Sequence, residues 1–363
     1  MTDTSALPTS LPPRPAGLPA RFTVVRTDAE LRMPRTDAVL RAWGGTVQVL
    51  PDGTPEDALL QAVADADLLL MCYARISARV INAAPRLRAI IKYGVGIDAI
   101  DTDAARARGL AVVNVPTYAE ETVAEGAFAL LMALYKRLKP VQHAMARDGW
   151  VWPEPRWLGQ DLSGRTLGLV GLGRIGRSMA RMAGAFRMRV LAHDPHLPAA
   201  AWPLAGIERC AGLDDLLEQA DAVSIHCVLN AQTRHLIGAP QLARMKPGAV
   251  LVNVSRGEIV DEAALAAALQ RGGLGGAALD VYGQEPLALV GHPLSALFAM
   301  DNVILSPHLT FYTEQAMQRL EDDTLARCVE ALRGEPLTVR SRDPRLRAQT
   351  RGVRFVDDDA MPG

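Results

Sequence analysis

TLGLVGLGRIG, residues 166–176, joins a run of apolar residues to three closely spaced glycines. The apolar run predicts a buried strand, and the residues after Gly173 predict the start of a helix. Gly171 permits a tight turn, Gly173 lets the backbone approach a pyrophosphate, and Gly176 lets the helix pack closely on the sheet. The free N–H groups and the positive dipole end of such a helix favour a phosphate. Because the glycines stand between a strand and a helix, this stretch predicts a dinucleotide-binding α/β fold.

Apolar runs continue after this stretch, with helical segments between them, and predict a domain with six strands, which matches a complete dinucleotide-binding fold. The six runs are 166–170, 188–193, 222–226, 249–254, 277–281 and 303–306.

The first part of the chain shows the same alternation. Continuous apolar runs of this kind are typical of parallel strands that are buried on both faces. The runs are 22–26, 46–50, 67–72, 88–92 and 111–115, with helices expected at 55–65 and 102–108. They predict a second parallel sheet that is covered by helices.

The connections between these parts predict a substrate domain that is discontinuous in sequence. A long apolar helix is expected from a capping box at Thr117 and Glu120 to a stop at Pro140. A last helix, at about 313–332 and ending before Gly334, is expected to return to the first domain. We therefore predict an α/β protein of two Rossmann-like or flavodoxin-like domains with parallel sheets. The ranges are 21–117 and 310–339 for the substrate domain, 118–309 for the nucleotide domain, 1–20 for a flexible Pro-rich arm and 340–363 for an Arg-rich tail, solvated or embracing a second subunit.

Composition narrows the class of protein. The chain has 363 residues, 49% hydrophobic and 22% charged, with a net charge of −1. This is the balance of a soluble globular protein, without the basic field that would hold nucleic acid or an acidic membrane surface. A helix needs about 20 apolar residues to span a bilayer, and no segment approaches that length. The Pro-rich start does not have the pattern of a signal peptide. The cysteines lack CxxC spacing, which favours buried thiols in a reducing cytoplasm and offers no metal site. They are Cys72, Cys210, Cys227 and Cys328.

Asp194 indicates which dinucleotide is bound. It stands at the end of the strand that follows the glycine segment, in LAHDPH. A carboxylate at this place accepts hydrogen bonds from the ribose hydroxyls and repels a 2′-phosphate. The sequence therefore favours NAD over NADP.

Three polar residues follow the ends of neighbouring predicted strands. Arg256 follows 249–254, Glu285 follows 277–281, and His308 follows 303–306. Ligand sites of α/β sheets form at the carboxyl ends of strands, so these side chains are expected to lie together. A histidine exchanges a proton near neutral pH, a carboxylate on its other nitrogen sets the tautomer, and an arginine holds a carboxylate in a planar fork. This is the chemistry of removing a hydride from C2 of a 2-hydroxy acid.

At this point the sequence resembles a known family, the NAD-dependent D-isomer-specific 2-hydroxyacid dehydrogenases, from about Leu68 to Gly334. The matching segments are KYGVGIDAID (92–101), ETVAEGAFALL (121–131), GLGRIG (171–176), NVSRGEIVDEAAL (253–265), ALDVYGQEP (278–286) and SPHLTFYT (306–313). The resemblance implies a D-2-hydroxyacid dehydrogenase in which His308 is the acid/base, Glu285 its partner and Arg256 the substrate-binding arginine.

The resemblance also implies the remaining site residues and a homodimer. The backbone of Gly94, Val95 and Gly96 would bind the substrate carboxylate across a cleft from Arg256, which suits glycine-rich anion binding. Besides the three glycines of 171–176, the NAD would be lined by Arg174, Ile175, Asp194, Thr233, Asp280 and Thr122. Trp150, Trp152 and Trp157 lie in a segment that we expect to cover another domain or subunit.

The chain departs from the family pattern in two loops. Val228 stands near the adenosine where the family usually has a proline, and Ala99 changes the family's DNID segment. Lys92 and Tyr93 flank the carboxylate loop, and two roles are possible for them. They contact the tail of the substrate, or they are a snorkelling lysine and a tyrosine that packs in the core.

The sequence also suggests two functions other than that of a dehydrogenase with free turnover. The aromatic pair Phe311 and Tyr312 resembles that of D-lactate-type enzymes and of the C-terminal-binding corepressors, and with the terminal extensions it suggests an NAD-sensing binding module. A polarised histidine beside a carboxylate-binding arginine argues against a pure sensor. A regulated phosphoglycerate dehydrogenase is disfavoured because the C-terminal extension is short. The sequence leaves the identity of the 2-hydroxy acid, the physiological direction and the oligomeric state open.

Overall fold

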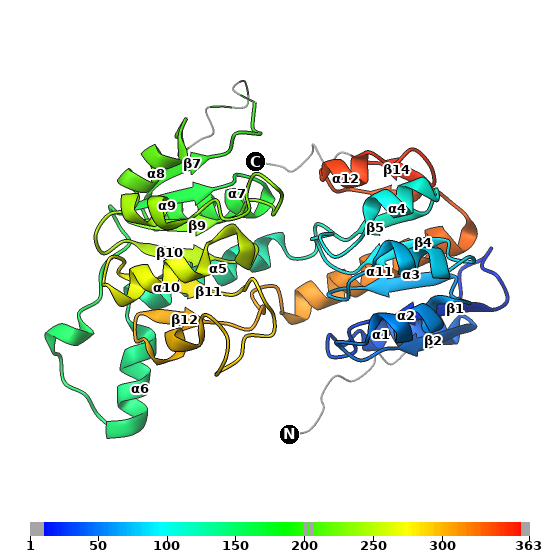
Figure 1. Cartoon of the computed structure of the whole chain (residues 1–363), viewed down its shortest axis with the longest axis horizontal. Helices are drawn as coiled ribbons and strands as arrows, with labels where there is room; N and C mark the ends of the chain where they lie inside the picture. The colour runs from blue at the N-terminus through cyan, green and yellow to red at the C-terminus, as the bar shows by residue number, and fades with distance from the viewer. Residues whose placement is uncertain (1–10, 199, 201, 203–205, 357–363) are drawn as a thin grey trace. The chain divides into compact units, whose positions relative to one another are not determined.

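The computed structural model describes residues 11–198, 200, 202 and 206–356. The chain divides into two compact units (Figure 1). Unit 1 is Met1–Ala119 with Thr313–Gly363, and unit 2 is Glu120–Tyr312. The first unit is thus built from both ends of the chain. The boundaries lie slightly beyond the expected ones at 117/118 and 309/310.

Unit 1 contains a parallel five-stranded sheet with the order β2-β1-β3-β4-β5, which is the flavodoxin-like order. Its strands are β1 Phe22–Arg26, β2 Gly45–Val49, β3 Leu68–Met71, β4 Ala89–Lys92 and β5 Ala111–Asn114. All residues of β3, β4 and β5 are buried. The prediction of burial on both faces was wrong for β2, whose residues are half-buried or exposed. The reason is its place at the edge of the sheet.

The helices of unit 1 flank this sheet. They are α1 Pro34–Ala42, α2 Glu56–Val63, α3 Ala78–Ala83, α4 Thr102–Ala107, α11 Glu314–Arg333 and α12 Pro344–Arg347. Helix α11 begins where the Thr313 hydroxyl accepts a hydrogen bond from the Ala316 N–H, and it ends at Gly334, whose φ of 71° is left-handed. It packs on α1 and β4, so the last long helix belongs to the first unit.

The prediction of a flexible arm was wrong for residues 11–20. The Arg14 Nε donates to the Trp43 carbonyl at 2.7 Å, and the Trp43 ring nitrogen donates to the Pro12 carbonyl at 3.2 Å. Leu18 is buried. Reciprocal hydrogen bonds and an apolar contact therefore hold this segment on the end of α1. Residues 1–10 of the expected arm lie outside the described residues.

The prediction of a solvated tail was wrong for much of residues 340–356, which fold back onto unit 1. This segment contains α12 and the strand β14 Val353–Phe355, which pairs with β13 Leu337–Val339. Gln349 is buried, and its side-chain amide exchanges two hydrogen bonds with the backbone of Val112 in the edge strand β5. The segment thus covers part of an open sheet edge. Residues 357–363 lie outside the described part.

Unit 2 contains a parallel seven-stranded sheet with the order β12-β11-β10-β9-β6-β7-β8, the Rossmann arrangement. Its strands are β6 Thr166–Val170, β7 Arg189–His193, β8 Ile207–Arg209, β9 Ala222–Ile225, β10 Val250–Asn253, β11 Gly276–Leu279 and β12 Val303–Leu305. The prediction of six strands was wrong by one, because β8 was missed. Ile207–Arg209 is short, and its side chains are half-buried or exposed, so it carries no apolar run.

Helices cover both faces of this sheet (Figure 1), and short 3-10 helices lie in its loops. They are α5 Glu120–Tyr135, α6 Leu138–Asp148, η1 Pro155–Trp157, α7 Arg174–Ala185, α8 Leu213–Gln219, α9 Ala239–Arg244, η3 Gly257–Ile259, α10 Glu262–Gln270 and η4 Ser295–Ala299. No helix in the described ranges combines the length and apolarity that a membrane crossing requires.

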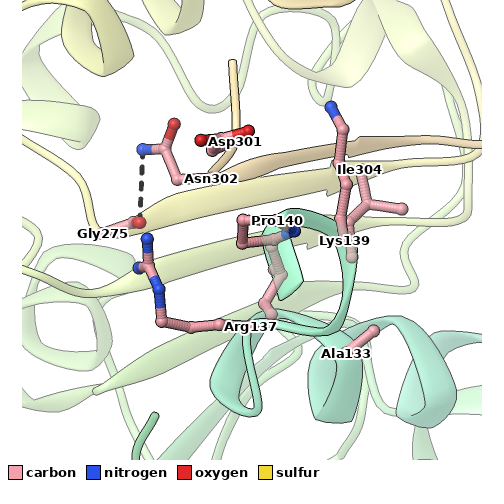
Figure 2. A pocket seen from close by; sticks show the side chains of 9 residues that line it. Ala133, Arg137, Lys139, Pro140, Gly275, Asp301, Asn302 and Ile304 are labelled. Carbon is pink, nitrogen blue, oxygen red and sulfur yellow. Dashed lines mark hydrogen bonds between the residues drawn. The ribbon is translucent and has the colours of Figure 1, made fainter. Parts of the chain in front are cut away.

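The prediction of one helix from Thr117 to a stop at Pro140 was wrong. Helix α5 begins at Glu120 and ends at Tyr135, and Arg137, with a left-handed φ of 51°, turns the chain into α6. Pro140 lies in the first turn of α6, where a missing N–H leaves no hydrogen bond unmade. Figure 2 shows this corner beside β11 and β12, around a small cavity. The Lys139 ammonium donates to the Met300 and Val303 carbonyls at 2.8 and 2.7 Å and ties α6 to the sheet.

Candidate active site

The glycine segment in unit 2 turns sharply at the end of β6. A Cβ at Gly171, whose φ is +95°, would lie 2.6 Å from the Cys227 nitrogen, and one at Gly176 would lie 2.4 Å from the Gly171 carbonyl oxygen. Both positions therefore require glycine. Above Gly173, the residue that precedes α7, no atom lies within 4 Å of a Cβ position. This helix start leaves room for the close approach of a phosphate, which fits a dinucleotide.

Asp194 is joined to the glycine segment. Its two carboxylate oxygens accept hydrogen bonds from the backbone N–H groups of Leu172, at 2.9 Å, and His196, at 3.0 Å. A carboxylate oxygen has a second lone pair, so each oxygen can still accept from a ribose hydroxyl. Asp194 therefore suits the expected ribose contact and also shapes the loop that would hold the phosphates.

Four other residues expected at the nucleotide have structural roles of their own in unit 2. Arg174 forms an ion pair with Glu120 at 3.2 Å, and Thr122 is buried in α5. The Thr233 hydroxyl donates to the Val228 carbonyl at 2.6 Å and accepts from the Asn230 N–H at 2.8 Å. Thr233 thus closes the loop in which Val228 replaces the family's proline. Ile175, at the start of α7, packs against the apolar core under the sheet.

Arg256, Glu285 and His308 follow three adjacent parallel strands, β10, β11 and β12. The His308 Nδ1 lies 3.0 Å from one Glu285 oxygen, and the other oxygen accepts from the Tyr282 N–H at 3.0 Å. Because the carboxylate accepts a hydrogen bond, it holds the proton on Nδ1 of a neutral imidazole. The Nε2 atom is then the nitrogen that can accept a proton from a ligand.

The charge of Glu285 is favoured in this setting. Burial raises the pKa of Glu285, but the hydrogen bond and charge of His308, the Tyr282 N–H and the charge of Arg256 together outweigh burial and lower it. Glu285 is therefore ionised at neutral pH and can stabilise an imidazolium at His308.

This lowered pKa predicts how stability depends on pH. Ionised Glu285 stabilises the folded state above its ordinary pKa of 4.5, and this contribution is lost as the pH falls through the lower folded pKa. The melting temperature of Glu285→Gln should thus lie below that of the wild type near neutral pH, and the gap should narrow below about pH 4.5. Thermal melts of both proteins across this range measure the gap. A gap that widens on acidification would contradict the assigned charge.

Arg256 stands on a turn that is shaped by the end of β10. The Asn253 side chain donates to the Arg256 carbonyl at 2.9 Å and accepts from the Ser255 N–H at 3.1 Å. The Arg256 guanidinium donates to the Ser255 carbonyl at 2.7 Å. The arginine is half-buried beside the Glu285 carboxylate, whose pKa it lowers.

Gly257 is a site residue that the sequence analysis missed. A Cβ here would lie 1.9 Å from the Tyr282 carbonyl carbon and 2.2 Å from the Gly283 nitrogen. Only a glycine lets the loop of Arg256 approach the loop of Glu285 this closely. The one available signal was a glycine directly after the arginine in NVSRGEIV.

Asp280, which was expected to line the NAD, accepts hydrogen bonds from the loop that follows His308. It is fully buried. One oxygen accepts from the Leu309 N–H at 2.9 Å, and the other accepts from the Thr310 N–H at 3.0 Å and hydroxyl at 2.6 Å. His308 has a left-handed φ of 58°, and the bonds to the next two residues hold this turn. Asp280 is therefore placed to position the histidine.

We expect Asp280→Asn to lower kcat by about tenfold or more, because an amide nitrogen cannot accept the hydrogen bonds that hold the His308 turn. The Kd for NADH should change little, whereas a cofactor-binding role would raise it. Steady-state kinetics and NADH fluorescence titration separate the two roles. Thr310→Val is the milder control, since it removes only the hydroxyl bond.

The expected carboxylate loop lies in unit 1, after β4. Gly94 has a φ of +150°, and the exposed Val95 turn is held by a bond from the Asn114 side chain to the Val95 carbonyl at 2.6 Å. Tyr93 is fully buried, and its hydroxyl donates to the Thr27 carbonyl at 2.5 Å, so it packs rather than reads a substrate. Lys92 is buried too, which contradicts a snorkelling lysine.

In the residues that the structure describes, no group of three or more His, Cys, Asp or Glu side chains could hold a metal ion.

Comparison with known proteins finds relatives over most of the chain. Residues 128–310 match the family model of the D-isomer specific 2-hydroxyacid dehydrogenase, NAD binding domain. The chain is 40% identical over 280 residues to a glyoxylate reductase of Korarchaeum cryptofilum, covering 76% of this chain and 83% of the relative. It is 41% identical over 300 residues to a D-3-phosphoglycerate dehydrogenase of Mycobacterium bovis, covering 82% of this chain. The match covers only 55% of that relative, so the chain spans about half of its length.

The fold comparison agrees with the sequence comparison. A crystal structure of D-lactate dehydrogenase from Aquifex aeolicus, complexed with NAD and lactic acid, matches with a TM-score of 0.76 and 29% identity. The match covers 86% of this chain and 96% of that chain. With a glycine segment that fits a dinucleotide and a family model that spans half of its residues, the chain belongs to the D-isomer specific 2-hydroxyacid dehydrogenase family, and unit 2 contains that family's NAD-binding domain.

Proposed function

We propose that the chain is an NAD-dependent D-2-hydroxyacid dehydrogenase, which transfers a hydride reversibly between NAD(H) and a small 2-oxo or 2-hydroxy acid. The observation that carries this proposal is the contact of 3.0 Å between the His308 Nδ1 and a Glu285 oxygen. It lies at the carboxyl ends of strands in the same sheet that contains β6, the strand that leads into the glycine segment.

His308 is the proposed acid/base. In the oxidative direction its Nε2 takes the proton of the substrate hydroxyl while the C2 hydride leaves. NAD, when bound, supplies the acceptor of that hydride. The ionised Glu285 stabilises the imidazolium that forms at His308. In the reductive direction the imidazolium returns the proton to the carbonyl oxygen.

Arg256 and the carboxylate loop are the proposed substrate-binding groups. The planar guanidinium of Arg256 suits a carboxylate and a polarised carbonyl oxygen. The backbone N–H groups of Val95 and Gly96 are proposed to bind a substrate carboxylate, as N–H groups do in anion-binding turns, while the Gly94 N–H donates to the Lys92 carbonyl at 3.0 Å and shapes the turn. Glycine at position 94 suits this role, since its φ of +150° is one that other residues rarely adopt.

The test is a panel of 2-oxo acids followed by the loss of NADH absorbance. The names of the relatives suggest glyoxylate and 3-phosphohydroxypyruvate, and pyruvate and hydroxypyruvate extend the series in size. We expect turnover of at least one acid with NADH, weaker turnover with NADPH, and oxidation of the D-enantiomer alone in the reverse direction. No turnover on any of these acids would overturn the proposed activity, and NADH-dependent capture of a protein partner without turnover would favour a sensor.

A cytoplasmic homodimer completes the proposal. Trp150, Trp152 and Leu158 are 67%, 73% and 78% exposed, and the two tryptophan rings stack edge to face at 6.1 Å. Large apolar side chains gathered in one segment are typical of a protein interface. The four cysteines are free thiols, which suits a reducing compartment. Light scattering of the full chain measures the oligomeric state, and a monomer would exclude the dimer.

A further inference from the structure

A buried lysine and a buried cysteine lie in contact beneath the carboxylate loop of unit 1. The Lys92 Nζ is 3.2 Å from the Cys72 Sγ and also donates to the Cys72 carbonyl. The two residues are 5% and 7% exposed. The Cys72 backbone N–H donates to Asp28 at 2.7 Å, which holds the cysteine at the end of β3 beside the end of β4. The two side chains are thus kept together by the sheet.

The ammonium changes the chemistry of this thiol. A positive charge in contact with a cysteine stabilises the thiolate, which is the reactive form. Burial is the largest influence on the other three cysteines: it raises the pKa of Cys210, and it raises those of Cys227 and Cys328 to about 12. Cys72 is therefore expected to be the cysteine that reacts first with an oxidant.

The pair also touches the loop above it. A Cβ at Gly94 would lie 3.1 Å from the Lys92 Cε and Nζ and 3.7 Å from the Cys72 Sγ. The two reactive atoms thus lie next to the Gly94 turn, so a covalent link that draws them together would act on this turn.

We propose that Cys72 and Lys92 form a peroxide-sensitive site, in which oxidation joins the sulfur of Cys72 to the side-chain nitrogen of Lys92. The consequence for activity rests on the proposed function, because it assumes that the Gly94–Gly96 loop binds the substrate carboxylate. The cross-link itself does not depend on any activity.

The reaction needs one molecule of hydrogen peroxide and balances in two steps. The Cys72 thiolate attacks one peroxide oxygen, so that an S–O bond forms and the O–O bond breaks. The departing hydroxide takes a proton from the Lys92 ammonium and becomes water, which leaves a sulfenic acid beside a neutral amine. The amine then attacks the sulfur, an N–S bond forms, and the S–O bond breaks. The departing hydroxide takes one of the two protons on the nitrogen and becomes a second water, and the other proton stays on the N–S link.

The product would alter the carboxylate loop in two ways. The link replaces the Lys92 ammonium by an uncharged nitrogen. It also shortens the distance between the Cys72 sulfur and the Lys92 nitrogen, next to Gly94. Both changes weaken the binding of an anion to the loop above. A thiol reductant cleaves an N–S bond of this kind and restores both side chains.

The experiment treats the full chain with hydrogen peroxide and maps its peptides by mass spectrometry. We expect a linked peptide that contains Cys72 and Lys92, lighter than its two parts by two hydrogen atoms and absent after dithiothreitol. In parallel, kcat/KM for the 2-oxo acid should fall by about tenfold and recover with dithiothreitol, mainly through KM. Cys72→Ala should keep the activity of the untreated wild type and resist peroxide.

Two further variants make the result specific. Lys92→Arg keeps a cation beside the thiol but offers no amine for the link, so a sulfenic-acid probe should label Cys72 without any cross-link. Cys210→Ala removes another buried cysteine and should behave as the wild type. The proposal is overturned if Cys72 remains a thiol while other cysteines oxidise, or if the wild type shows no Cys72–Lys92 link. Failure of the proposed dehydrogenase activity would appear separately, in the untreated protein.

Discussion

Replacing His308 with Gln should lower kcat by about 10²–10⁴-fold, the contribution that general acid–base catalysis by one side chain usually makes. Glutamine can still form hydrogen bonds, but it cannot take up the substrate proton as the hydride leaves. The Kd for NADH should change little, because the glycine segment and Asp194 lie on other loops of the sheet. Stopped-flow measurement of hydride transfer, together with fluorescence titration of NADH, gives the two quantities.

The matched control for this variant is His235→Gln. His235 is exposed in unit 2 and has a φ of 53°, close to the 58° of His308. Both substitutions therefore place glutamine at a left-handed position, so a loss that comes from backbone strain would appear in both variants. Normal turnover in His308→Gln would exclude the assigned acid/base. Equal losses in the two variants would do the same.

Gly257→Ala should be the most damaging change of a residue that does not itself react. The added Cβ would lie 1.9 Å from the Tyr282 carbonyl carbon, and backbone atoms cannot swing away as a flexible side chain can. The loops of Arg256 and Glu285 must separate, which breaks the geometry of the site. Overpacking of a buried position typically costs about 1–3 kcal/mol of folding stability, and a conflict with backbone atoms falls at the upper end. In folded protein we expect kcat/KM to fall by at least about a hundredfold.

Gly184→Ala is the control for the loss of a glycine. Gly184 lies within α7, and no atom is found within 4 Å of its Cβ position. Alanine there should raise stability by about 0.5–1 kcal/mol, because it favours helix more than glycine does. Thermal unfolding measures the stability of both variants, and steady-state kinetics measures their kcat/KM. Wild-type stability and activity in Gly257→Ala would show that the two loops do not need this close approach.

The parallel sheets could be predicted from the sequence for a simple reason. Strands that are buried on both faces, such as β3, β4 and β10, need continuous apolar residues, and such runs are visible without a structure. Strand β8 was missed because Ile207–Arg209 is an edge strand, whose side chains need not be apolar. Local patterns thus revealed the centre of the sheet better than its edge.

The helix ends and the chain termini were harder to predict because distant contacts decide them. Arg137 adopts a left-handed backbone conformation that the local sequence does not predict. Pro140 does not end a helix, because a proline in the first helical turn removes no hydrogen bond. At the termini, Arg14 bonds to Trp43, and Gln349 bonds to Val112. Neither pairing leaves a periodic pattern that could be read along the chain.

The sequence by itself determined the α/β class and the nucleotide turn at 171–176, and it predicted Arg256, Glu285 and His308 at the ends of neighbouring strands. Each depends on a local requirement, such as glycine where a side chain would clash, or on the order of strands that brings their ends to one edge. Only the tertiary structure decided how the site is supported: Gly257 permits the approach of two loops, and Asp280 holds the turn of His308. Lys92 and Cys72 meet only because β3 and β4 are neighbours. Such contacts join residues far apart in the chain, so their distances exist only once the sheet has formed.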